Sequence, residues 1–157
     1  MKRTYIKNAR IVNEGQVFEG SLVIADEVIA EVLKAGELPS VACEETIDAQ
    51  GCYLLPGVID DHVHFRDPGL THKADMYTES MAAAAGGVTS YMDMPNTNPQ
   101  TTTLEALEDK FKDAATKSIV NYSFYFGATN NNADSLALLD KKKVCGVKLF
   151  MGSSTGN

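Results

Sequence analysis

Two histidines separated by one residue are the part of this sequence best suited to chemistry. His62 and His64 follow an apolar run that ends at Asp60, and Arg66 lies two residues further on. If the run is a strand, side chains two apart point to the same face, so the two imidazoles project together. Imidazole is a common zinc ligand. The spacing therefore predicts a metal platform at a strand end, although an isolated His-x-His more often has no such role.

Asn96 and Lys148 become candidate functional residues only when they are considered together with other segments of the sequence. Asn96 lies in a loop between two prolines, after the apolar run 88–94, and such an asparagine is typical of a turn. Lys148 lies in the apolar run 144–150, where a single lysine is usually a solvated charge. Neither residue indicates a function by itself.

The elements that would position these residues alternate between strand and helix from residue 55 onward. Leu104, Leu107 and Phe111 recur at spacings of three and four, which predicts one apolar helix face. The alternation favours parallel βα units, as in a doubly wound sheet or a (β/α)8 barrel. A complete barrel needs about 250 residues, so about four strands make roughly half of one. The expected elements are a helix over 74–85 ended by Gly86 and Gly87, a strand over 88–94, a helix capped by Thr102 or Thr103, a strand over 119–126, a short helix over 134–139 and a strand over 144–150.

The first part of the chain has a different pattern. Residues 4–32 are rich in strand-forming residues, and Asn13-Glu14-Gly15 predicts a hairpin reversal within a small, half-buried antiparallel sheet. We therefore expect a small β-sandwich-like domain over 1–54. The first half of a TIM-type barrel, of about four βα units, follows over 55–157.

Composition and charge exclude several classes of protein. The chain has 157 residues, of which 44% are hydrophobic, and a net charge of -7. This is the composition of a globular domain. No apolar run is long enough to span a membrane and no signal core opens the chain, so we expect a cytoplasmic protein. No basic stripe indicates binding to nucleic acid. The three cysteines form no C-x-x-C pair, and we expect reduced thiols.

Three segments together resemble one family. Asp60-x-His62-x-His64-x-Arg66 resembles the first metal motif of the amidohydrolase superfamily, and in particular of its cyclic-amide hydrolases. Met94-Pro95-Asn96-Thr97 resembles the dihydroorotase signature, whereas allantoinases usually have Met-Pro-Leu-Asn and dihydropyrimidinases generally lack the arginine. Lys148 matches the lysine that many members carboxylate. The resemblance covers essentially the whole chain.

The resemblance implies a role for each matching residue. His62 and His64 would bind zinc, and carboxylated Lys148 would bridge two zinc ions. Arg66 and Asn96 would hold the carboxylate of the substrate, for which a guanidinium and an amide are suitable donors. The family's general acid/base aspartate and two further histidines come from later strands, beyond Asn157. We therefore expect no catalytic acid/base within this chain, and no hydrolase activity from it alone.

The implied reaction is the reversible hydrolysis of dihydroorotate to N-carbamoyl-L-aspartate in pyrimidine biosynthesis. We expect a small-molecule substrate, no membrane or nucleic-acid partner, and a homodimer at full length. The alternatives are an allantoinase or a dihydropyrimidinase (hydantoinase), and, from another class, a non-catalytic dihydroorotase-like scaffold protein.

Overall fold

A two-residue turn joins the first two strands of the fold. The computed structural model describes residues 1–153, in which β1 (Arg3–Asn13) and β2 (Gln16–Ala25) pair antiparallel with Asn13 opposite Gln16. Glu14 and Gly15 both have positive φ, 48° and 74°, as a tight hairpin turn of the primed type requires. The expected reversal at this position is confirmed.

The amino-terminal unit, Met1–Pro56, is a mixed sheet and not an antiparallel one as expected. Strand β3 (Val28–Lys34) pairs with β2, whereas β4 (Glu45–Asp48) and β5 (Tyr53–Leu54) both pair parallel to β1. The parallel pairing arises because residues 35–44 carry the chain back past β2 to the other edge of β1. Residues 1–56 form one sheet, so they do not themselves supply the second layer of a sandwich.

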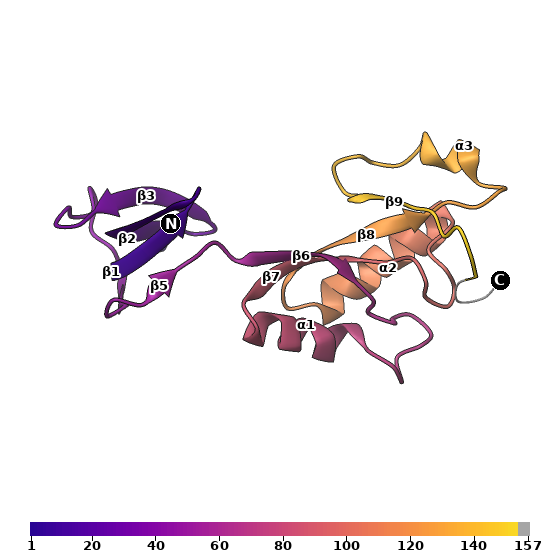
Figure 1. Cartoon of the computed structure of the whole chain (residues 1–157), viewed down its shortest axis with the longest axis horizontal. Coiled ribbons are helices and arrows are strands. Elements are labelled where there is room, and N and C mark those ends of the chain that lie inside the picture. Colours follow the sequence, from indigo (N-terminus) through magenta and orange to yellow (C-terminus); the bar gives the residue numbers. More distant parts are fainter. Residues whose placement is uncertain (154–157) are drawn as a thin grey trace. The chain divides into compact units, whose positions relative to one another are not determined.

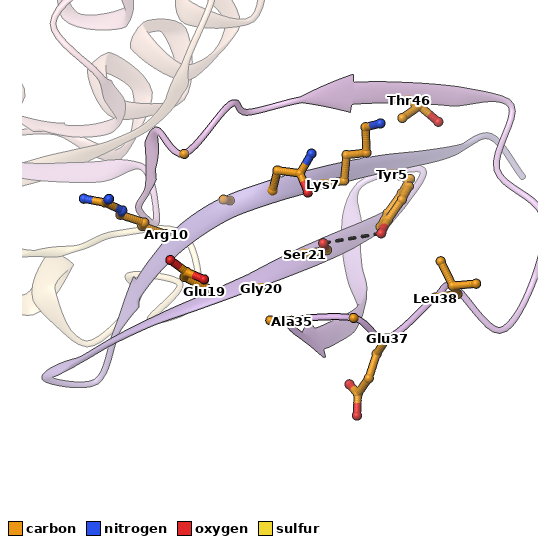
Figure 2. A pocket seen from close by; sticks show the side chains of 14 residues that line it. Tyr5, Lys7, Arg10, Glu19, Gly20, Ser21, Ala35, Glu37, Leu38 and Thr46 are labelled. Atoms are coloured by element: carbon orange, nitrogen blue, oxygen red, sulfur yellow. Dashed lines mark hydrogen bonds between the residues drawn. The ribbon is translucent and has the colours of Figure 1, made fainter.

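One face of this sheet carries an open depression of about 720 Å³ (Figure 2). Tyr5 on β1 donates a hydrogen bond from its hydroxyl to Ser21 Oγ on β2, at 3.4 Å. Lys7 and Arg10 line the depression together with acidic side chains from β2 and from the segment after β3. The mixture of both charge signs on an open face indicates no particular class of ligand.

The second unit begins at Gly57 and contains one curled, fully parallel sheet (Figure 1). Its strands, in spatial order, are β6 (Val58–Val63), β7 (Val88–Asp93), β8 (Asn121–Gly127) and β9 (Gly146–Lys148). The connections contain α1 (Met76–Ala85), α2 (Leu104–Lys117) and the single turn α3 (Ala133–Leu136). The expected βα alternation is confirmed, although β9 and α3 are shorter than expected. None of the helices within residues 1–153 is long and apolar enough to cross a membrane.

Local capping explains where the two long helices begin and end. The side chain of Asp75 accepts a hydrogen bond from Thr78 N at the start of α1, and Thr103 Oγ1 accepts from Ala106 N, at 3.1 Å, at the start of α2. Gly86 is the C-cap of α1, and Gly87 follows at a φ of 86°, which glycine adopts without strain. Both the glycine stop and the Thr103 cap agree with expectation.

The core of the second unit lies between the two long helices and the sheet. The buried residues of α2 are Leu107, Lys110 and Ala114, and Phe111 packs against the core from its edge. Leu104, expected on the apolar face, is 38% exposed because it lies in the first turn, beyond the edge of the core. The buried face of α2 is therefore rotated from the expected one and has a lysine at its centre. The core cluster comprises Phe65, Met76, Tyr91, Leu107, Ala114, Phe124 and Phe126.

Candidate metal and substrate site

The two histidines of the first motif lie side by side at the carboxyl end of β6. His62 is the penultimate residue of the strand, and His64 follows the last one. Their ring centroids are 5.3 Å apart, with an angle of 51° between the ring planes, and both side chains are exposed. Both imidazoles can therefore reach one ion above the strand end.

Asn96 joins the second motif to the first. Its Oδ1 lies 2.8 Å from His64 Nδ1, and its backbone oxygen accepts a hydrogen bond from Arg66 Nη1 at 3.2 Å. An amide oxygen can only accept, so in this arrangement Nδ1 is the donor, and Nε2 is the ring nitrogen that remains available to a metal ion. Asn96 is buried, at 8% exposure. The structure thus brings His64, Arg66 and Asn96 together.

Lys148 lies at the same end of the parallel sheet, as the last residue of β9. Strands β7 and β8 separate it from β6. Its backbone oxygen accepts from Ala128 N at 2.8 Å, and its ammonium lies over the ring of Phe150, 5.1 Å from the centroid. No hydrogen bond or ion pair joins the Lys148 side chain to His62 or His64 in the described residues. Asn96, in contrast, is hydrogen-bonded to His64.

The donor set fits part of a zinc site. Catalytic zinc takes three protein ligands and keeps one open position. Within residues 1–153, no three His, Cys, Asp or Glu side chains are grouped closely enough to hold a metal ion. The two imidazoles are suitable ligands, and a lysine becomes one only after carboxylation to an anion. Further ligands would have to complete the coordination sphere.

A buried ion pair beside this site was not foreseen from the sequence. Asp93, the last residue of β7, lies with its Oδ2 2.6 Å from Lys110 Nζ, and both side chains are fully buried. Burial raises the pKa of Asp93 and lowers the pKa of Lys110, and in each case the charge of the partner opposes the shift. In the sequence, the burial of Lys110 is indicated only by its position three residues after Leu107, on the apolar face of a helix.

Asp67 ties the segment after β6 to both long helices. Its carboxylate lies 3.0 and 3.1 Å from Lys117 Nζ at the end of α2, and it accepts from Met76 N at 3.4 Å at the start of α1. Asp61, which also flanks the histidine motif, accepts at its backbone oxygen from the Tyr125 hydroxyl at 3.0 Å. Both residues therefore connect the segment around the histidine motif to neighbouring elements of the second unit.

Comparison with known proteins identifies the family. Residues 51–153 match the sequence profile of the dihydro-orotase-like proteins, and the chain belongs to this family. It is 38% identical to a dihydroorotase of Methanosarcina acetivorans over 156 residues, 99% of the chain and 33% of the relative. It is 42% identical to an allantoinase of Deinococcus radiodurans over 111 residues, 70% of the chain and 25% of the relative.

Solved structures of related enzymes have the same fold. The chain superimposes on an L-hydantoinase (dihydropyrimidinase) from Arthrobacter aurescens with a TM-score of 0.90 and 31% identity, covering 98% of this chain and 34% of that one. The chain thus spans about a third of the length of the curated relatives it matches. The names of these relatives are all those of cyclic-amide hydrolases, in agreement with the resemblance of the motifs.

Proposed function

We propose that the complete protein is a dihydroorotase, which interconverts dihydroorotate and N-carbamoyl-L-aspartate in pyrimidine biosynthesis. The observation that carries this proposal is the Met-Pro-Asn-Thr loop, whose Asn96 contacts both His64 and Arg66. By the same resemblance, we propose that the four-stranded sheet is the first half of a (β/α)8 barrel. We also propose that the amino-terminal sheet is one layer of a β sandwich, and that the protein is a cytoplasmic homodimer.

Arg66 and Asn96 are proposed to orient the substrate through its carboxylate. The oxygen of the Asn96 amide is engaged by His64, so its Nδ2 group is the part of this side chain that would donate to an anion. The Arg66 guanidinium presents several donors in one plane, and its Nη1 donates to the Asn96 backbone oxygen. A carboxylate gripped by both residues would fix the ring relative to the histidines, which lowers the entropic part of the barrier.

His62, His64 and carboxylated Lys148 are proposed to hold two zinc ions, with further ligands from outside residues 1–153. Bound zinc supplies Lewis acidity at the ring carbonyl and lowers the pKa of a water molecule. His64 would bind through Nε2, because its Nδ1 faces Asn96. In the hydrolytic direction, water adds to the ring carbonyl, the amide C–N bond breaks, and the departing nitrogen takes up a proton. No residue described here is assigned as the donor of that proton.

Allantoin and hydantoins are the alternative substrates within the same family. The allantoinase and hydantoinase relatives favour them, as does the close superposition on the L-hydantoinase. A paired arginine and asparagine favour a substrate that carries a carboxylate. A non-catalytic scaffold is the alternative from another class, and the presence of His62, His64 and Lys148 argues against it.

The test is a substrate panel on the complete protein, with metal analysis of the same preparation. We expect turnover of dihydroorotate, and Arg66→Gln should raise its KM on the order of 10- to 100-fold because a charge-assisted contact is lost. Arg10→Gln, on the amino-terminal sheet, is the matched control and should leave KM unchanged. Turnover of allantoin or hydantoin without dihydroorotate would overturn the choice of substrate. Near-zero bound zinc together with no turnover would favour the scaffold.

A further inference from the structure

The buried pair of Lys110 and Asp93 has no part in the proposed reaction. Both side chains are fully buried, and their charged atoms are 2.6 Å apart. Removing two charges from water is costly, and a hydrophobic pair of similar volume is often at least as stable. Stability alone is therefore a weak reason for this pair, and its other contacts suggest what it does.

The Lys110 ammonium contacts two residues of the chain that leads into the Asn96 loop. It contacts Asp93 Oδ2, donates to the backbone oxygen of Met94 at 3.2 Å, and lies over the ring of Phe124, 4.7 Å from the centroid. The backbone N–H of Met94 donates in turn to Val63 O at 3.0 Å. Met94 is thus held from α2 on one side and from β6 on the other, two residues before Asn96.

The second oxygen of Asp93 reaches the histidine motif. Asp93 Oδ1 accepts a hydrogen bond from the backbone N–H of Phe65 at 2.8 Å. Phe65 lies between His64 and Arg66, and its buried ring packs on Tyr91 with centroids 4.4 Å apart. A continuous series of contacts therefore runs from Lys110 through Asp93 to the residue that joins the proposed metal ligand to the proposed substrate ligand.

We propose that Lys110 is a positioning residue, which fixes the 62–66 and 94–97 segments relative to each other through Asp93 and the Met94 carbonyl. The His64–Asn96 contact needs this fixed relation, because it joins one side chain from each segment. The inference rests on the proposed function for its catalytic meaning. The contacts of Lys110 with Asp93 and Met94, from which it is argued, lie within the second unit.

The test compares variants of the complete protein by hydrogen exchange and by the absorption spectrum of the cobalt-substituted form. Lys110→Met removes the ammonium and keeps the length of the side chain. Asp93→Asn combined with Lys110→Met leaves no buried charge unpaired and keeps an acceptor for Phe65 N–H, so it guards against a single variant that does not fold. Leu107→Ala is the comparison variant, because it also weakens the buried face of α2 but removes no polar contact to Asp93 or to the Met94 carbonyl.

We expect amide exchange in 62–66 and 94–97 to accelerate at least about tenfold in both Lys110 variants, since each loses the donor to Met94 O. Their cobalt affinity should fall on the order of tenfold, with shifted d–d bands, as when a residue that orients metal ligands is lost. In Leu107→Ala, any acceleration of amide exchange should not be concentrated in 62–66 and 94–97. The cobalt absorption spectrum of this variant should match that of the parent.

Two results would overturn the positioning role. One is a double variant whose exchange in the two segments and whose cobalt spectrum equal those of the parent. The other is the same local exchange and spectral change in Leu107→Ala as in Lys110→Met. Failure of the parent to turn over dihydroorotate would overturn the proposed function instead, and the exchange measurement would still decide whether Lys110 links the segments.

Discussion

The contact between His64 and Asn96 makes a sharp prediction about metal binding. Asn96→Ala removes the oxygen that accepts the hydrogen bond from His64 Nδ1, so the imidazole loses both its fixed tautomer and its fixed orientation. Loss of such an outer partner typically costs 10- to 100-fold in metal affinity, which corresponds to about 1.4 to 2.7 kcal/mol. Because Asn96 is only 8% exposed and the contact is 2.8 Å long, solvent is a poor substitute, and we expect the upper part of that range.

Asn96→Asp separates the proposed metal role of this residue from its proposed substrate role. A carboxylate accepts more strongly from an imidazole N–H than an amide oxygen does, so zinc affinity should be retained or raised. The same carboxylate repels the substrate anion and cannot donate to it, so KM should rise. Asn96→Ala, in contrast, should both lower zinc affinity and raise KM. The comparison of the two variants therefore distinguishes the two proposed roles.

Competition with a chromophoric zinc chelator, on the complete protein, measures the affinity directly. Asn121→Ala is the control, because Asn121 is an exposed asparagine at the start of β8. The proposed role of Asn96 in orienting His64 would be refuted if the zinc affinity of folded Asn96→Ala were within twofold of that of the parent.

Three further predictions concern stability, and thermal unfolding of the complete protein checks each. Thr103→Ala should destabilise α2 by about 1 kcal/mol because the N-cap bond to Ala106 N is lost, whereas Thr103→Ser should be nearly neutral. Hydrogen bonds from Thr78 lower the pKa of Asp75, so this cap stabilises the fold above the unfolded-state pKa of the carboxyl and loses its effect as pH falls through the folded value. The melting difference between the parent and Asp75→Ala should therefore shrink on acidification, and a constant difference would contradict this. Gly69 has a φ of 84°, and an added Cβ would collide with Asn98 O. Gly69→Ala should therefore lower the midpoint and disturb the site. Gly36→Ala should lower the midpoint by less, because its φ of 87° strains an added side chain but the space around it is open.

Local patterns were sufficient to predict most of the second unit. The paired glycines after α1, the Thr103 cap and the repeated strand and helix segments act within a few residues, and the structure confirms them. The placement of His62 beside His64 follows from the two-residue period of a strand, and the rings are indeed adjacent.

Features that depend on distant partners could not be predicted in this way. The parallel pairing of β4 and β5 with β1 depends on where a ten-residue connection leads, which no local spacing encodes. Lys110 shows the same limit, because a lysine on an apolar face is normally expected to reach solvent. Its burial becomes intelligible only when Asp93, seventeen residues earlier and on another element, is seen beside it.

The hydrogen bond between the two motifs also bears on how such enzymes can be redesigned. A chimaera that received only the Met-Pro-Asn-Thr loop of a relative would exchange the group proposed to orient a metal ligand along with the group proposed to hold the substrate. Loop grafting at this position would therefore alter metal loading and specificity at once. A chimaera that keeps both properties would have to exchange the 62–66 and 94–97 segments together.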